Sequence, residues 1–270
     1  MDINRVRSLF PSEKIEHIAR GVKSDVFRTV SGKIIRVKPL LFGTYEKERR
    51  VLDFIKANGG IGCGTPSPSC FVRGLSAWSV HDDIRGVNPD SGEFAKLPPG
   101  AQKRFAKQLA ESLVKFYRMG RAAKKSDIGK LLRRRDAFSF LRNLRRYMFI
   151  RKYVHKNGVW AKFSKLSRSV APMGGGLVHG DLHARNIICG PDFSLAGIID
   201  FDGAKFGHFE HNLRKLDPLL GDMVMDCLEN IWNKKPNRSR LGYYRMISLI
   251  KKIKKAKDKT VSVRELESSF

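Results

Sequence analysis

Two short polar segments, each bordered by apolar residues, restrict the fold of this chain most. Residues 179–186 read HGDLHARN and follow an apolar pair, and residues 198–202 read IIDFD and close an apolar run that starts at Leu195. Short apolar runs bounded by polar and turn residues are typical of strands joined by loops. Residues 190–192, Gly-Pro-Asp, are a turn signal. We therefore expect a strand, a polar loop and then a hairpin.

Three oxygen-bearing side chains in these segments have the spacing that phosphoryl transfer needs. That chemistry requires a carboxylate near the attacking hydroxyl and oxygen ligands for Mg²⁺. Asp181 can supply the first, and Asn186 and Asp200, expected on adjacent hairpin strands, can supply the second. An aspartate in a glycine-containing loop is usually a turn former. Here, however, the segments at 179–186 and 198–202 follow each other in the expected order between apolar strands, which favours a role in phosphoryl transfer. Asp202 stays open between metal binding and a turn role.

The same residues resemble the aminoglycoside phosphotransferase and choline kinase family, which is built on the protein-kinase fold. The kinase catalytic loop places an Asp and an Asn five positions apart, as Asp181 and Asn186 are here. Glycine stands where protein kinases carry arginine in this family, which matches Gly180. The resemblance implies that Asp181 is the catalytic base, that Asn186 and Asp200 bind the metal, and that His179 braces the loop.

The resemblance extends from about residue 15 to about residue 220 and implies an α+β fold with two lobes. The N-terminal lobe, residues 1–83, would be a small antiparallel sheet that binds the nucleotide. The C-terminal lobe, residues 84–270, would be larger, mainly helical, and would carry the catalytic and acceptor-binding residues. Both lobes would form one catalytic unit, with ATP and Mg²⁺ as its cofactors.

Three segments near the N-terminus have the patterns of strands, at residues 15–19, 25–30 and 33–38. By resemblance, the turn before the second strand covers the nucleotide, where Ser24 would offer its hydroxyl and backbone N–H to phosphate. Alternation puts Arg36 and Lys38 on one face of the third strand. One of them would contact the α- and β-phosphates. Arg36 aligns better, although both could be ordinary surface cations.

Residues 45–55 have the apolar spacing of a helix. The segment resembles the helix whose glutamate pairs with the strand cation, which makes Glu48 the expected partner and Glu46 the alternative. Residues 78–86 resemble the link between the lobes, where backbone groups near Val80 and Asp82 would contact the adenine.

Two segments of the C-terminal half position the catalytic loop by resemblance. Residues 102–117 repeat apolar side chains at helical spacing and predict a core helix under that loop. Residues 207–213 align with a family segment that contains two aspartates, but His208 and Asn212 replace them here. Asn212 can still donate and accept hydrogen bonds as a brace of the loop. Asp217 is a possible substitute brace.

The charge of the chain bears on its acceptor. The formal net charge is +27, which attracts anions such as nucleic acid, anionic lipid or phosphorylated glycans. Residues 121–156, a predicted helical stretch, are dense in Lys and Arg and would help to shape the acceptor pocket by resemblance. Pockets for cationic acceptors need carboxylates or aromatic cages. We therefore expect an anionic acceptor, a small molecule or glycan such as a lipopolysaccharide core sugar.

The remaining segments bear on the cellular location of the protein and on the alternatives to a kinase with an anionic acceptor. The charged N-terminus and the lack of a long apolar run predict a cytoplasmic protein. Residues 243–253 form an amphipathic basic pattern, which predicts either packing on the C-terminal lobe or peripheral docking at an anionic inner membrane face. The rivals are an antibiotic kinase, a protein or RNA-associated kinase, for which nucleic-acid binding is possible but not favoured, and a non-catalytic kinase-like binding module.

Overall fold

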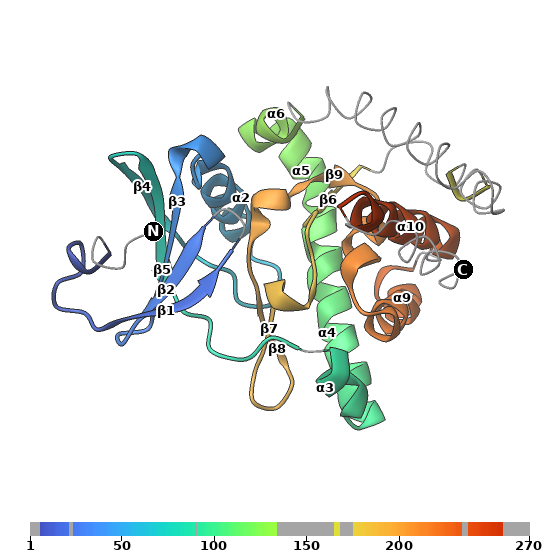
Figure 1. The fold of residues 1–270 in the computed structure, drawn as a ribbon. Coiled ribbons are helices and arrows are strands. Elements are labelled where there is room, and N and C mark those ends of the chain that lie inside the picture. The colour runs from blue at the N-terminus through green and yellow to red at the C-terminus, as the bar shows by residue number, and fades with distance from the viewer. Residues whose placement is uncertain are drawn as a thin grey trace.

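The computed structural model describes residues 6–21, 24–89, 91–133, 165–167, 175–233 and 237–255. A sheet-rich N-terminal lobe lies beside a mainly helical C-terminal lobe (Figure 1). The predicted two-lobed α+β fold is therefore confirmed. The predicted boundary between residues 83 and 84 lies in the connection that follows the last strand of the N-terminal lobe, and it stays a prediction.

Five strands of the N-terminal lobe form an antiparallel sheet in the order β1-β2-β3-β5-β4. Because side chains alternate along a strand, Ile35 and Val37 lie on one face of the third strand, where they pack with Phe27 and Trp78 in a separate small core. Arg36 projects from the opposite face. The three predicted strands match the first three of the sheet, whose members are β1 (Ile15–Arg20), β2 (Asp25–Thr29), β3 (Lys33–Pro39), β4 (Ser69–Arg73) and β5 (Ser76–Asp82).

Helix α2 (Glu46–Ala57) confirms the predicted helix and follows β3 through the 3₁₀ turn η1 (Leu40–Phe42). Acidic residues in its first turn and Lys56 in its last turn both favour the helix dipole. The apolar side of α2 packs in the same core cluster as the C-terminal lobe. Glu48 is on the buried side of the helix and is only 1% exposed, which requires a charged partner.

The link between the lobes begins later than the sequence suggested. Residues 78–82 belong to β5, so the chain leaves the sheet only after Asp82. Val87 then exchanges backbone hydrogen bonds with Cys189, at 2.9 and 2.7 Å. The link fits closely against Cys189, because a Cβ on Gly86 (φ +149°) would lie 2.1 Å from the Cys189 carbonyl oxygen. This bridge attaches the link to the catalytic-loop region.

The long helix α4 runs through the centre of the C-terminal lobe (Figure 1). It contains the predicted helix at residues 102–117, and its apolar residues Phe105, Leu109, Leu113 and Phe116 are at most 1% exposed. The predicted helical stretch at 121–156 is described only to Arg133, where it consists of two helices, and its later cations lie outside the described residues. The helices of this part are α3 (Ser91–Lys96), α4 (Pro99–Arg118), α5 (Gly120–Lys125) and α6 (Asp127–Arg133).

Two small two-stranded sheets carry the polar segments. The strand before the catalytic loop, β6, pairs with β9, and the strand after the loop, β7, pairs with β8 in the predicted hairpin. Register and order therefore bring the two polar segments together at one end of the β7–β8 hairpin. The segments are β6 (Gly176–Val178), η4 (Ala184–Asn186), β7 (Ile187–Cys189), β8 (Leu195–Ile198), η5 (Phe201–Gly203), β9 (Lys205–Gly207) and η6 (Phe209–Lys215).

Two C-terminal helices, α9 (Pro218–Trp232) and α10 (Arg238–Lys255), complete the lobe. The apolar residues Leu241, Met246 and Ile250 of α10 are at most 2% exposed, and α10 packs against η6. Of the two readings of the basic helix, packing on the lobe is the one that the structure supports for this apolar face. Within the described ranges, no helix is both long enough and apolar enough to cross a bilayer.

Candidate active site

The backbone of the loop at residues 179–183 depends on a glycine and an asparagine. Gly180 has a φ of +81°, and a Cβ there would lie 2.0 Å from the Gly203 carbonyl oxygen. No residue with a side chain fits this left-handed, crowded position. Asn212, which is fully buried, accepts a hydrogen bond from the His179 backbone N–H at 2.8 Å. Asn212 therefore does contact the loop as a brace, as its donor and acceptor groups allowed.

His179 lies inside the protein and supports the loop from below. Its Nε2 lies 2.9 Å from the Ile199 carbonyl oxygen, so Nε2 donates, and its Nδ1 accepts from the Asp181 backbone N–H at 3.3 Å. Burial lowers the pKa of His179 to about 4, which keeps the ring neutral. The side chain is 0% exposed. A bracing role agrees with this burial, whereas direct contact with a substrate does not.

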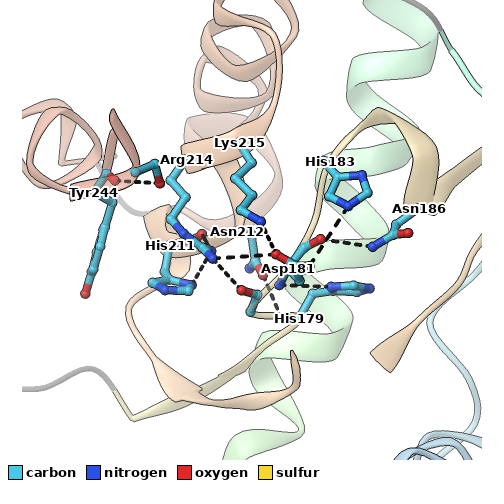
Figure 2. Close-up of polar contacts among 11 residues, drawn as sticks. His179, Asp181, His183, Asn186, His211, Asn212, Arg214, Lys215 and Tyr244 are labelled. Atoms are coloured by element: carbon cyan, nitrogen blue, oxygen red, sulfur yellow. Dashed lines mark hydrogen bonds and ion pairs between the residues drawn. The ribbon is translucent and has the colours of Figure 1, made fainter. Parts of the chain in front are cut away.

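Three cationic or titratable side chains surround the Asp181 carboxylate (Figure 2). Lys215 Nζ forms an ion pair with Asp181 Oδ1, Arg214 Nη2 lies 4.0 Å from the same oxygen, and His183 Nε2 lies 4.0 Å from Oδ2. Burial acts to raise the pKa of Asp181, but the hydrogen bond and charge of Lys215, with His183 and Arg214, outweigh it and lower the pKa. Asp181 is therefore an ionised carboxylate at neutral pH.

Asn186 and Asp200 are neighbours at the end of the β7–β8 hairpin. Asn186 Nδ2 donates to the Asp181 carbonyl oxygen at 3.0 Å, and the Asn186 carbonyl oxygen accepts from the Ile199 N–H at 3.0 Å. Asp200 follows Ile199 directly. The expectation that both residues lie on the hairpin strands is wrong: Asn186 ends η4, just before β7, and Asp200 lies between β8 and η5. The structure thus brings Asp181, Asn186 and Asp200 to one end of the hairpin.

The electrostatics around Asp200 favour a bound cation. Burial, then the nearby Glu48 carboxylate, raises the pKa of Asp200 to about 6, and Asp202 and Asp181 add to this effect while Arg36 opposes it. Such a concentration of carboxylates is relieved by a divalent cation. Asp200 also has a left-handed backbone, with φ +64°, and strain of this kind in a non-glycine residue is common at functional sites.

The residues present fit Mg²⁺ better than a metal that needs a complete protein cage. In the part of the chain that the structure describes, no group of three or more His, Cys, Asp or Glu side chains could hold a metal ion. Mg²⁺ is commonly bound by one or two protein oxygens together with waters and substrate phosphates. Asn186 and Asp200 match that donor set.

Arg36 and Glu48 form the ion pair that the sequence predicted between the strand and the helix. Arg36 Nη2 lies 2.5 Å from Glu48 Oε2, and the side chains are 14% and 1% exposed. The Arg36 Nε is buried and has no hydrogen-bond partner among the described residues. Lys38 Nζ instead lies 4.2 Å above the Tyr45 ring. Glu46, the alternative partner, is exposed and pairs with Arg49 at 2.7 Å.

The other predicted nucleotide-binding residues lie around the sheet. Ser24 precedes β2, and its carbonyl oxygen accepts from the Gly21 N–H at 2.7 Å, which closes the turn. Val80 lies inside the sheet between Ile35 and Ser69. Asp82 ends β5, and its carboxylate pairs with Lys33 at 2.5 Å. The nucleotide contacts of these three residues stay predictions.

A cavity of about 400 Å³ lies next to the Asp181 carboxylate. Two of its lining residues, His183 and Lys215, are the same side chains that contact Asp181. Arg185 adds a second permanent positive charge to the wall. The remaining lining residues are mostly apolar and come from the link, α3, η4, the segment after η6 and the start of α9: Pro89, Phe94, Ala184, Leu216, Asp217, Pro218 and Leu220.

The sequence reasoning missed three cations and misassigned one aspartate. Arg214 and Lys215 follow Asn212 by two and three positions, and Lys47 precedes Glu48, so position near a recognised motif was the signal that could have identified them. Asp217 is not a brace of the loop. It caps α9 by accepting from the Leu219 N–H at 2.9 Å, a role that aspartate before a helix commonly has.

Solved structures with a similar fold include aminoglycoside phosphotransferases. The GDP complex of wild-type aminoglycoside 2'-phosphotransferase-IIIa has a TM-score of 0.73 at 14% identity, covering 98% of this chain and 96% of that one. The streptomycin–ATP–APH(2")-IIa ternary complex has a TM-score of 0.68 at 15% identity, covering 98% and 95%. APH(3'')-Id from Streptomyces rimosus, with ADP and streptomycin, has a TM-score of 0.56 at 14% identity, covering 90% and 94%.

Sequence comparison is more specific than these structural matches. No curated protein matches the chain at a significant level. The phosphotransferase enzyme family, however, matches residues 14–216, which include both lobes' polar motifs and the residues around Asp181. The chain therefore belongs to the phosphotransferase enzyme family and is a kinase with the protein-kinase-like fold.

Proposed function

We propose that this kinase transfers the γ-phosphoryl group of ATP to a hydroxyl of an anionic small molecule or glycan. The observation that carries the proposal is the cavity of about 400 Å³ whose wall shares His183 and Lys215 with the Asp181 carboxylate. A hydroxyl in this cavity would be close to an ionised carboxylate. Asp181 accepts the proton of that hydroxyl as its oxygen attacks the γ-phosphorus.

The nucleotide would be bound between the lobes by residues of both. Arg36, held by Glu48, contacts the non-transferred phosphates, and its buried unpaired Nε supports this role. Lys38 is the weaker candidate, because Arg36 has the predicted ion pair with Glu48. Ser24 contacts phosphate at the β1–β2 turn, and the backbone near Val80 and Asp82 contacts the adenine. Residues 1–83 and 84–270 act as two lobes of one catalytic unit.

Asn186 and Asp200 would hold Mg²⁺. The raised pKa of Asp200, about 6, supports this because burial and neighbouring carboxylates destabilise its ionised form without a cation. The ion, when bound, neutralises charge on the phosphates. The chain's own contribution is to fix both oxygen ligands next to Asp181 through the loop and hairpin hydrogen bonds.

The walls of the cavity support an anionic acceptor. Arg185 and Lys215 bring two positive charges to a small volume, and the chain as a whole carries a net charge of +27. A phosphorylated or acidic sugar, such as a lipopolysaccharide core sugar, suits such a site better than a polycation. A protein of this kind would work in the cytoplasm, where contact with the inner membrane face could bring it to a lipid-linked sugar.

An aminoglycoside kinase is the second candidate. The proteins of similar fold include complexes with streptomycin and kanamycin, although identities of 15% and 16% support only the fold. An aminoglycoside is a polycation and would meet Arg185 and Lys215. Turnover of an aminoglycoside panel at rates far above those with sugar phosphates would favour this candidate over the first.

The test uses the full chain, labelled ATP and fractionated cell extract. Native protein and Asp181→Asn are incubated in parallel with each fraction, and labelled products are identified by mass spectrometry. A phosphorylated, acidic product that forms only with the native protein supports the proposal. Identical product profiles from both proteins would contradict it. Steep salt dependence of binding to added RNA would instead favour the RNA-associated alternative.

A further inference from the structure

Lys215 belongs both to the Asp181 site and to the cavity. Its Nζ pairs with Asp181 Oδ1, and its side chain, 37% exposed, also lines the cavity wall (Figure 2). The neighbouring Arg214 is different: it is 5% exposed, and its Nη2 donates to the Gly180 carbonyl oxygen at 2.5 Å. Arg214 is therefore fixed beside Asp181, whereas Lys215 has room to change its partner.

The cavity wall contains two permanent cations, Arg185 and Lys215, and one carboxylate, Asp217. The Asp217 carboxylate in its wall already accepts the Leu219 N–H and caps α9. Arg185 lines the wall and has no ion pair within the described part of the chain. The pKa of His183 is lowered, chiefly by burial, so this ring adds no charge at neutral pH. An anionic group in the cavity would thus meet two permanent cations, Arg185 and Lys215, and a single carboxylate, Asp217, that already caps a helix.

We propose that Lys215 is the acceptor-recognition residue and that it exchanges Asp181 for the anionic group of the acceptor when the cavity fills. This inference rests on the proposed function and assigns its specificity to named residues. In the free protein, the Lys215 ammonium forms an ion pair with the Asp181 carboxylate. With acceptor bound, Lys215 and Arg185 bind its phosphate or carboxylate, and Arg214 alone remains beside Asp181.

The exchange leaves one Asp181 oxygen free for the transfer. The acceptor hydroxyl oxygen forms a bond to the γ-phosphorus, and its proton passes to Asp181. The bond between the γ-phosphorus and the bridging oxygen breaks, and ADP leaves with that electron pair. A neutral acceptor provides nothing to draw Lys215 away, so the same contact disfavours neutral hydroxyl compounds and water.

The first experiment measures binding without nucleotide, so that it does not depend on turnover. Glucose 6-phosphate, inorganic phosphate and glucose are titrated into the full-length protein at constant ionic strength and followed by NMR of labelled lysine side chains. We expect the two phosphates to bind saturably and to move the Lys215 signal, and glucose to bind at least about tenfold more weakly. Lys215→Met and Arg185→Met should each weaken phosphate binding about tenfold or more.

Lys103→Met is the matched control. Lys103 is an exposed residue of α4 and does not line the cavity, so its replacement should leave phosphate affinity unchanged. Equal affinity for glucose and glucose 6-phosphate, absence of phosphate binding, or unchanged affinity in Lys215→Met would each overturn the inference. Lys215→Arg should restore part of the affinity, because it returns the charge.

A second measurement separates recognition from a merely structural role. If Lys215 only supports Asp181, Lys215→Met lowers kcat with a phosphorylated acceptor and leaves phosphate affinity intact. If Lys215 instead binds the acceptor, the main effect of Lys215→Met is on KM, which should be about tenfold higher for that acceptor. Failure of the proposed function has its own signature. The native protein would still bind phosphate at Lys215, but it would phosphorylate no extract fraction, so its product profile would equal that of Asp181→Asn.

Discussion

At the scale of single residues, the ion pair between Arg36 and Glu48 is the buried charged pair of the proposed nucleotide site. Arg36 is 14% exposed and Glu48 only 1%, so neither charge is well solvated without the other. Arg36 also hydrogen-bonds Ser79 Oγ at 3.3 Å. The guanidinium is thereby fixed in one orientation, and its Nε is buried without a hydrogen-bond partner among the described residues.

Glu48→Gln should weaken nucleotide binding much more than Glu46→Gln. The first change removes the charge that orients a buried guanidinium, and we expect the KM for MgATP to rise about tenfold and stability to fall by about 1–3 kcal/mol. Glu46 is exposed on the same helix, so its variant should stay within about 0.5 kcal/mol of the native protein. Steady-state kinetics and urea unfolding measure both. Equal effects would refute the assignment of Glu48.

His179 should make the fold sensitive to acid. Its folded pKa of about 4 lies below the ordinary histidine value because the ring is buried. The unfolded state therefore binds more protons between pH 6.5 and pH 4, and stability is complete above pH 6.5 and is lost as pH falls toward 4, by about 1.4 kcal/mol per pH unit. NMR titration of the ring tests the cause; a pKa near 6.5 in the folded protein would exclude it.

At the scale of elements, the catalytic loop depends on backbone geometry as much as on side chains. Gly180 and Gly32 have nearly the same φ, +81° and +82°. They differ in surroundings, because a Cβ on Gly180 would strike the Gly203 carbonyl oxygen, whereas a Cβ on Gly32 would meet nothing within 4 Å. Substitutions at these two glycines therefore separate the effect of the left-handed backbone on stability from the effect of steric crowding.

Gly180→Ala should therefore be far more damaging than Gly32→Ala. We expect a cost of about 1–2 kcal/mol for Gly32→Ala, which is the left-handed penalty alone. Gly180→Ala should cost at least about twice as much and should abolish turnover, because the backbone at residue 180 and the Gly203 carbonyl group must move apart. Thermal unfolding and an ATP-turnover assay provide the comparison. Similar losses for both variants would show that crowding at Gly180 is relieved without consequence.

Helix α2 is attached to the segment after Asp200 through Lys47. Lys47 Nζ donates to the Asp202 carbonyl oxygen and, at 3.0 Å, to the Ala204 carbonyl oxygen. These bonds connect the helix that carries Glu48 with η5, so the two sides of the nucleotide site share one support. Removal of the ammonium would leave both carbonyl groups without this donor.

Lys47→Met should loosen the site without touching ATP directly. We expect stability to fall by about 1.5–3 kcal/mol, as for lost hydrogen bonds to a charged group, and the KM for MgATP to rise several-fold. Lys56→Met, at the exposed end of the same helix, serves as the control and should change neither quantity. A normal KM in Lys47→Met would mean that Glu48 and Asp200 are positioned independently of each other.

At the scale of the whole molecule, a nucleotide that contacts both lobes should stabilise them together. Saturating MgATP, at about 100 times its Kd, should add about 2.7 kcal/mol and raise Tm by about 5–10 °C. Excess EDTA should remove most of this gain, as should Asp200→Asn, in which asparagine tolerates the left-handed backbone. Differential scanning fluorimetry is sufficient. A full Tm increase with ATP in EDTA would argue against Asn186 and Asp200 as metal ligands.

Local patterns in the sequence were enough for the elements and for the motif residues. Alternation predicted β1 to β3, helical spacing predicted α2 and α4, and the five-residue interval from Asp181 to Asn186 indicated phosphoryl transfer. The pair of Arg36 with Glu48 was also predictable, because strand and helix residues were matched to a family pattern. These features depend on residues close together in the chain or on recurring motifs.

The tertiary structure alone decided what surrounds the site. β6 pairs with β9 and not with β7, Asp217 caps a helix, and Lys215 reaches Asp181 across 34 positions of sequence. Such contacts depend on how η6 packs beneath the loop, and no periodicity encodes that packing. The sequence by itself thus determined the family and the fold class, and it predicted the reacting and metal-binding groups. Only the three-dimensional arrangement placed two cations and a cavity beside them, because long-range contacts arise from packing of the whole chain.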